Sequence, residues 1–193
     1  MDDIPGTKLL FRDKKGLRYF DGPPSFTPAS PISKKPIVDN TLTKDLDIRI
    51  GPYFSNDGNL MMIACKDDDS KIQILNVNTG NTIGVIPCKE DAEQMNFSPL
   101  GTYVWTWRSP SKSSTPTANL NVWKLNFNES NKEAICEISY HQKKYSSDAL
   151  QWSSNELLCT RSVTNEIHIL NGQALSADIL GKIRHEAFTS FTL

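Results

Sequence analysis

The feature that most constrains this chain is a pentapeptide pattern that occurs three times. An aromatic residue, a serine and a tight turn follow one another in FSNDG (54–58), FSPLG (97–101) and WSSNE (152–156). The aromatic anchors are separated by 43 and 55 residues. A period of about 40–45 residues, with four strands in each unit, is typical of β-propeller blades. The repeat therefore predicts a fold built from similar units in tandem.

Each unit contains four short runs rich in β-branched and aromatic residues, as strands require. One run ends in the aromatic anchor and three follow it after turns. In the first unit they are DIRIGPYF (47–54), LMMIAC (60–65), KIQILNV (71–77) and NTIGVIP (81–87). In the second they are AEQMNF (92–97), TYVWTW (102–107), NLNVWKL (119–125) and AICEISY (134–140), and in the third DALQW (148–152), ELLCTR (156–161), EIHILN (166–171) and ADILGKI (177–183).

The turns between the runs carry residues that tight turns need. Gly58 and Gly101 are free to adopt positive φ, and Pro99 fixes φ inside the second turn. The stretch NTGN (78–81) is a further hairpin signal. WSSNE has no glycine at the corresponding position, so the third unit is a weaker match.

One four-stranded sheet cannot bury both of its faces, whereas sheets stacked around an axis bury them against each other. The sequence therefore predicts an all-β chain, a partial β-propeller of WD-repeat-like type over 1–193. We expect an open arc of about three blades (46–89, 90–140 and 147–184). N-terminal strands (8–26) and a proline-rich connector (27–45) precede the blades, and 185–193 begin a further one.

The two ends of the chain carry further expectations. KLLFRDKKGLRYFDG (8–22) reads as two strands joined by a turn at Lys14, Lys15 and Gly16. Near the other end, SADILGKIRHEAF (176–188) is compatible with a short capped helix, but Gly181 and the repeat favour a strand. Three blades leave end faces and strand edges uncovered, so we expect a lower stability than the length suggests.

Composition restricts the classes of function. The chain has 193 residues, enough for a domain with a real core, and a net charge of -1, so RNA binding would need a local basic patch. No apolar run approaches the ~20 residues of a membrane span, and the acidic start MDDIPGTKLL is unlike a signal peptide. A cytoplasmic location is the default expectation. The four cysteines form no CxxC pair, and Cys65 and Cys159 read as buried thiols.

Catalytic, metal and cofactor motifs are not found in the sequence. The histidines, His141, His168 and His185, lie in no HExxH, and neither GxSxG nor GxxxxGK[ST] occurs. Asp67, Asp68 and Asp69 are consecutive, unlike the spaced ligands of a calcium loop, so a solvated turn is expected. We expect no enzyme activity and no cofactor.

Basic residues occur as three pairs, Lys14-Lys15, Lys34-Lys35 and Lys143-Lys144. Tyr19, Phe20 and Phe26 lie near the first two pairs and Tyr145 near the third. Phosphate binding needs several cations on one surface, and aromatic side chains add stacking on single strands. These pairs are candidate RNA contacts, although such clusters are common on protein surfaces.

Other prominent residues favour structural roles. The four tryptophans, Trp105, Trp107, Trp123 and Trp152, fall inside expected strands and are core candidates. His168 points away from its neighbouring isoleucines, and Arg161 and Glu166 are placed to pair across a hairpin. RSPSKSSTPTA (108–118) lengthens the second unit as a loop, and NESNK (128–132) lengthens its next turn.

Two stretches resemble the eukaryotic translation initiation factor 2A family. LLFRDKKGLRYFDGPPSF (9–26) is similar to the N-terminal part of the family, with Gly22, Pro23, Pro24 and Phe26 after the second strand. ELLCTRSVTNEIHIL (156–170) is similar to its third blade. The resemblance implies a propeller of about nine blades with a helical tail beyond, of which this chain corresponds to the first portion.

The resemblance also implies a function. The family is implicated in delivering initiator tRNA to the small ribosomal subunit, and no enzymatic chemistry is attributed to it. The expected partners are the small ribosomal subunit, initiator tRNA, mRNA and other initiation factors, with no membrane. The alternative is a WD-repeat-type protein–protein scaffold without an RNA role, and a weaker third is a propeller enzyme without its catalytic half. The sequence assigns no individual residue to RNA binding.

Overall fold

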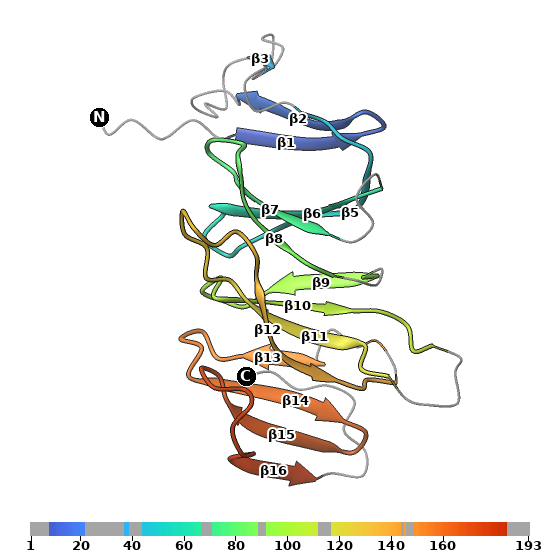
Figure 1. Ribbon diagram of the computed structural model, residues 1–193, viewed down its shortest axis with the longest axis vertical. Coiled ribbons are helices and arrows are strands. Elements are labelled where there is room, and N and C mark those ends of the chain that lie inside the picture. Colours follow the sequence, from blue (N-terminus) through green and yellow to red (C-terminus); the bar gives the residue numbers. More distant parts are fainter. Residues whose placement is uncertain are drawn as a thin grey trace, which may run out of the picture.

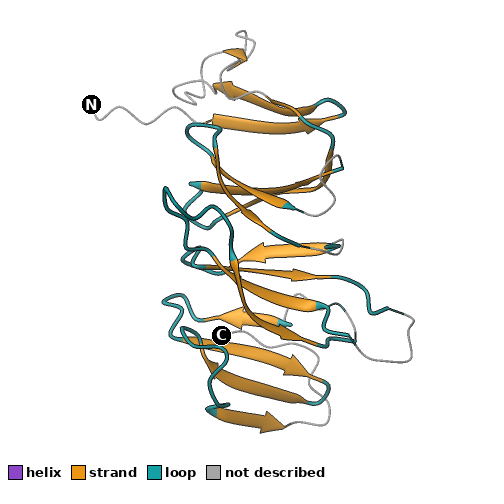
Figure 2. Cartoon of the chain, viewed as in Figure 1, coloured by secondary structure: helices purple, strands orange, loops and turns teal. Residues whose placement is uncertain are grey.

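The computed structural model describes residues 8–21, 37–38, 44–66, 71–88, 92–111, 117–143, 145 and 149–184. Every regular element within these ranges is a β-strand (Figure 2). The strands form four antiparallel sheets, which are stacked in chain order in an open arrangement (Figure 1). The predicted all-β fold is confirmed.

The N-terminal sheet contains β1 (Lys8–Asp13), β2 (Gly16–Asp21), β3 (Ile37–Val38) and β4 (Lys44–Asp45). The first blade contains β5 (Ile48–Phe54), β6 (Leu60–Cys65), β7 (Ile72–Asn76) and β8 (Thr82–Ile86). The second contains β9 (Gln94–Phe97), β10 (Tyr103–Trp107), β11 (Leu120–Lys124) and β12 (Ile135–Tyr140). The third contains β13 (Leu150–Trp152), β14 (Leu158–Val163), β15 (Glu166–Asn171) and β16 (Gly181–Arg184). In each blade, strands adjacent in sequence are paired. The limits of the blades as domains stay a prediction.

The serine of the repeated pentapeptide closes the first turn of each blade. Ser98 Oγ accepts a hydrogen bond from the backbone N–H of Tyr103 at 2.9 Å and donates to its carbonyl at 3.1 Å. The same two backbone groups are bound by the serine in the other blades, where the pairs are Ser55 with Leu60 and Ser153 with Leu158. The repeat therefore reflects one turn used three times.

The third turn differs from the first two in the residue at its left-handed position. Gly58 and Gly101 have φ values of 72° and 74°, and Glu156 takes the same region with φ 55°. A side chain in this region is strained. Glu156 is nevertheless buried, and its Oε1 accepts a hydrogen bond of 2.7 Å from the backbone N–H of Leu100 in the second blade. Glu156 thus stands in place of the glycine, and its side chain forms a contact between the second and third blades.

Hydrophobic layers fill the spaces between adjacent blades. The layer between the first and second blades includes Met62, Ile74, Met95, Val104 and Trp123. The layer between the second and third includes Tyr103, Trp105, Trp107, Trp152 and Leu170. Within it, the rings of Tyr103 and Trp152 stack with centroids 5.9 Å apart. All four tryptophans are buried, as predicted.

The predicted buried thiols are also confirmed. Cys65 and Cys159 lie in the core, as does Cys88, whereas Cys136 is exposed. Burial raises the pKa of the Cys159 thiol far above its usual value, because the thiolate would lose its hydration. Cys159 therefore behaves as a small apolar side chain in the folded protein.

The N-terminal hairpin covers the outer face of the first blade. Leu17 of β2 is fully buried against Ile48 and Met61. The Arg12 guanidinium donates to the carbonyl of Gly51 at 2.8 Å and to that of Ile48. The segment predicted as a connector supplies β3 and β4, which pair with β2.

The connection from β11 to β12 reaches back to the first blade. Val85 of β8 donates to the carbonyl of Lys132 at 2.8 Å and accepts from Ala134 at 2.9 Å. The ring of Phe127 lies against Gly84, where an added Cβ would overlap it. The insertion at 128–132 was expected only to lengthen a turn. Through these contacts, the connection that contains it links the second blade to the first.

The segment that was compatible with a helix contains a strand. Gly181 to Arg184 form β16 and pair with β15. Residues 176–180 carry no helix, and 185–193, expected to begin a further blade, lie outside the described residues.

Candidate nucleic-acid interface

The segment after β12 is held by one buried side chain. Asn119 is fully buried and precedes β11. Its Oδ1 accepts from the backbone N–H of Gln142 at 2.7 Å, and its Nδ2 donates to the carbonyls of Gln142 and Arg108 at 2.9 and 2.7 Å. His141 Nδ1 lies 3.0 Å from the carbonyl of Thr117. These contacts fix the backbone that precedes Lys143.

An exposed aromatic ring follows in the same segment. Tyr145 packs on the buried Trp107, with ring centroids 5.3 Å apart and an interplanar angle of 53°. Trp107 Nε1 also donates to the carbonyl of Gln142 at 3.4 Å. Tyr145 remains 46% exposed. The ring is therefore anchored on the core while much of its surface is open to solvent.

Arg161 joins the third blade to the second, but not as expected. Its guanidinium lies over the ring of Tyr140 at 4.0 Å, and Nη2 donates to the carbonyl of His141 at 3.1 Å. The expected pair with Glu166 across the hairpin is wrong, because the residue opposite Arg161 is His168. Burial lowers the pKa of Arg161 and raises that of Tyr140.

Glu166 instead interacts with the histidine on its own strand. His168 Nε2 lies 3.1 Å from Glu166 Oε2. This hydrogen bond is the largest cause of the lowered pKa of Glu166, with smaller contributions from the charges of Lys182 and Arg184. In the sheet, His168 is opposite Lys182 and Glu166 is opposite Arg184. Two cations of β16 thus lie on the same face of the sheet as Arg161 and His168.

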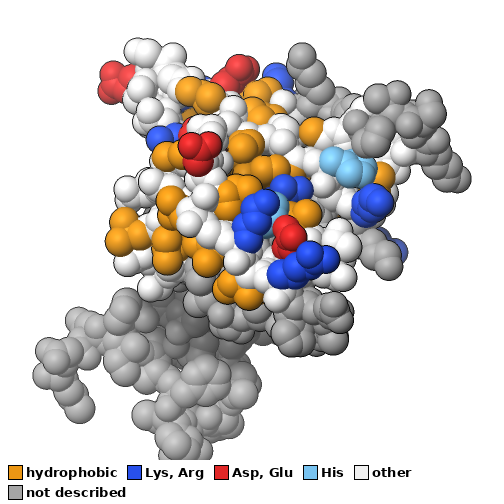
Figure 3. Space-filling model, turned by 90° about the horizontal axis from the view of Figure 1, so that it is seen from below, with side chains coloured by type: hydrophobic (Ala, Val, Ile, Leu, Met, Phe, Trp, Pro, Cys, Tyr) orange, Lys and Arg blue, Asp and Glu red, His pale blue; other side chains and the backbone are white. Residues whose placement is uncertain are grey.

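A cleft lies between the second and third blades. The cleft has a volume of about 580 Å³ and is lined by His141, Gln142, Lys143, Tyr145, Ser162, Val163 and Thr164. Seen from the end of the molecule that carries β16, Lys, Arg and His side chains gather on the surface beside hydrophobic ones (Figure 3). We call Lys143, which lines the cleft, together with Lys182 and Arg184 on β16, the third-blade basic surface. Such a surface can attract an anion, and Tyr145 can stack on a planar group.

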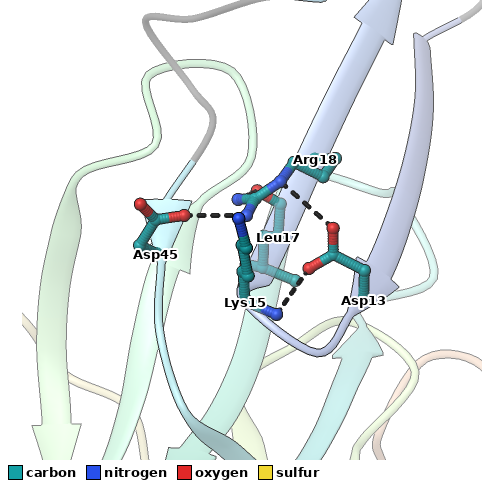
Figure 4. A network of polar contacts seen from close by, with 5 residues as sticks. All are labelled: Asp13, Lys15, Leu17, Arg18 and Asp45. Carbon is teal, nitrogen blue, oxygen red and sulfur yellow. Dashed lines mark hydrogen bonds and ion pairs between the residues drawn. The ribbon is translucent and has the colours of Figure 1, made fainter.

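The first basic pair has different surroundings. Lys14 and Lys15 are exposed in the turn between β1 and β2. Nearby, Arg18 pairs with Asp45 at 2.7 Å and with Asp13 at 3.3 Å (Figure 4). Lys66 pairs with Asp47 at 2.9 Å. Carboxylates therefore pair with Arg18 and Lys66, whereas Lys14 and Lys15 are exposed to solvent.

Several sequence candidates lie outside the described residues or carry no site. Lys34, Lys35, Phe26, Lys144 and Asp67–Asp69 fall outside the described ranges, as do the side chains of Tyr19 and Phe20. In the described part of the chain, no group of three His, Cys, Asp or Glu residues is arranged to hold a metal ion. The same residues contain no helix long and apolar enough to cross a bilayer.

Of the sequence candidates, the structure brings Lys143, Tyr145 and His141 to one cleft. Sequence reasoning missed Lys182 and Arg184, which were placed in a run of uncertain secondary structure. Their spacing of two residues was the available signal, since alternate residues of a strand share a face. Nothing in the sequence marks Asn119, because its role depends on a loop 23 residues away.

Comparison with known proteins gives the following likenesses. No family model matches the chain. Eukaryotic translation initiation factor 2A of Schizosaccharomyces pombe is 30% identical over 142 residues, covering 72% of this chain and 23% of the relative. The chain thus spans about a quarter of the length of that relative.

Solved structures show the fold. A crystal structure of a eukaryotic initiation factor matches with a TM-score of 0.73 and 23% identity, covering 97% of this chain and 43% of the other. KlHsv2 with loop 6CD replaced by a Gly-Ser linker matches with a TM-score of 0.52 and 10% identity, covering 97% and 56%. These comparisons confirm the predicted resemblance and the propeller fold.

Proposed function

Because the chain is a homologue of part of eukaryotic translation initiation factor 2A, we propose that it acts in translation initiation as a non-catalytic binding module. The observation that carries this proposal is the 30% identity over 142 residues. The match covers 23% of the relative and gives no direct evidence of RNA contact, so the partners are part of the proposal. They are the small ribosomal subunit, initiator tRNA, mRNA and other initiation factors, in the cytoplasm.

The architecture supports binding rather than chemistry. Stacked sheets form a rigid frame that presents loops and a face to large partners. The third-blade basic surface supplies exposed cations at one end, and at the N-terminal sheet Arg18 is paired with carboxylates while Lys14 and Lys15 are exposed. An exposed group of cations suits a protein that docks on a polyanion.

Co-sedimentation with purified small ribosomal subunits tests the proposal. The 193-residue chain is centrifuged with and without subunits at increasing KCl concentrations. We expect the chain to pellet only with subunits, and the bound fraction to fall as salt rises, because phosphate contacts release counterions. Equal pelleting without subunits, or no pelleting with them at low salt, would contradict the proposal.

One observation favours the second candidate, a protein–protein scaffold. A cleft of about 490 Å³ between the first and second blades is lined largely by apolar groups, including Pro87, Ala92 and Trp123. Apolar clefts with a few polar groups are typical binding sites for ligands or side chains of partner proteins. A scaffold would retain its partners after nuclease treatment and would not co-sediment with small subunits.

A further inference from the structure

We propose that the cleft between the second and third blades binds single-stranded RNA, with Tyr145 stacking on a base and Lys143 contacting phosphate. The choice of ligand rests on the proposed function in translation initiation. The site itself rests on shape, an anchored aromatic ring, a fixed backbone and local charge, which are independent features of the described residues.

The shape of the cleft suits a nucleotide. Its volume of about 580 Å³ falls within the ~300–1,000 Å³ typical of small-ligand sites. One wall is the segment that carries His141, Lys143 and Tyr145, and the other is the end of the β14–β15 hairpin at Ser162–Thr164. Hydroxyl, amide and imidazole groups in these walls can form hydrogen bonds with base edges or ribose.

Tyr145 has the properties of a stacking platform. Its ring rests on Trp107, which is 7% exposed and belongs to the core between the blades. The ring therefore needs little ordering when a base packs on its exposed surface. Base stacking on an aromatic side chain is tolerant of sequence, since every base presents a π-face.

The backbone beside the platform is preorganised. Asn119 forms three hydrogen bonds with Gln142 and Arg108, and Arg161 donates to the carbonyl of His141. Groups fixed before binding lose less conformational entropy when the ligand arrives. Lys143 thus follows directly after a backbone that is held at His141 and Gln142.

The charge around the cleft fits phosphate. Lys182 and Arg184 are exposed on β16, and their strand lies two strands from the Val163 end of β14. Glu166 lies among these cations but is engaged by His168. Because the chain as a whole has a net charge of -1, this concentration of cations is local. Consecutive phosphates of one strand can contact it while a base occupies the cleft.

An acidic protein segment would also be attracted to the cations. Binding of acidic side chains does not require an exposed aromatic ring beside a cleft of nucleotide size, whereas cations interleaved with aromatic side chains are typical of single-strand binding. We therefore favour RNA, and the test separates the two ligands.

Fluorescence anisotropy of a labelled uridine-rich RNA of about 12 nucleotides, within the ~4–16 nucleotides of known single-strand sites, measures binding to the 193-residue chain. We expect Tyr145→Ala to weaken binding about tenfold or more, and Tyr145→Phe to retain it. Lys143→Ala should weaken binding and make the dependence of log K on log salt shallower by about 1. Lys14→Ala/Lys15→Ala is the matched control for loss of exposed lysines and should bind as the parent chain does.

Three outcomes would overturn the inference. They are unchanged RNA affinity in Tyr145→Ala, an equal loss in the Lys14→Ala/Lys15→Ala control, and displacement of RNA by polyglutamate that is equally effective in Tyr145→Ala and the parent chain. Far-ultraviolet circular dichroism and thermal melts establish that each variant is folded. If RNA binding fails while the chain still co-sediments with small subunits, this inference is wrong and the proposed function stands. If RNA binds at the cleft but the chain does not co-sediment with small subunits, this inference stands and the proposed function is wrong.

Discussion

Glu156 occupies a position where the other two blades have glycine, and it shows how a single residue couples blades. The left-handed conformation costs a non-glycine residue roughly 1–2 kcal/mol. The hydrogen bond from Leu100 to its buried carboxylate, at 2.7 Å, opposes that cost. The sequence showed only that glycine was missing from WSSNE. It could not show the compensating bond, because Leu100 is 56 residues away.

Substitution of Glu156 should therefore separate strain from hydrogen bonding. Glu156→Ala keeps the strain and removes the acceptor, so we expect a loss of about 1.5–3 kcal/mol in the free energy of unfolding. Glu156→Gly also removes the acceptor but relieves the strain, and Glu156→Gln keeps an acceptor, so both should lose less than Glu156→Ala. Urea unfolding with unchanged m-values measures these differences. Equal stability of the alanine variant and the parent chain would show that the bond contributes nothing.

At the scale of elements, the strands were largely predictable and their connections were not. Runs such as LMMIAC and KIQILNV became β6 and β7, since short apolar runs bounded by turn residues specify strands locally. The pairing of Val85 with Lys132 and Ala134 depends on an insertion folding back over the neighbouring blade. No local pattern encodes that contact. The last strand was ambiguous because Ser176 could cap a helix, whereas Gly181 and the repeat favoured a strand.

The contact between Gly84 and Phe127 is the most direct test of this fold-back. Gly84→Ala should destabilise the chain by about 1–3 kcal/mol, because the new methyl group overlaps the Phe127 ring. The same substitution in a Phe127→Ala background should cost less, with a coupling of about 0.5–3 kcal/mol in a double-mutant cycle. Gly58→Ala is the control, since Gly58 has open space around it and its cost should not depend on Phe127. A Gly84→Ala cost that is the same in both backgrounds would refute the contact.

At the scale of the whole molecule, the important property is the distribution of charge along the stack. Near the N-terminal sheet, Arg18 and Lys66 are paired with carboxylates while Lys14 and Lys15 are exposed. At the other end, Lys143 lines the cleft and two further cations lie on β16. Counting charges in the sequence gave three basic pairs but did not bring Lys182 and Arg184 together. Strand register places these two cations on one face of β16, opposite His168 and Glu166.

The most direct test of the account is co-sedimentation of two charge-reversal variants with small ribosomal subunits. Lys182→Glu/Arg184→Glu alters the third-blade basic surface, and Lys14→Glu/Lys15→Glu makes the same change in net charge at the opposite end. We expect the first variant to lose at least about tenfold in affinity at low salt and the second to bind nearly as the parent chain does. Equal loss in both variants, or retention by the first, would contradict an oriented contact through the third blade.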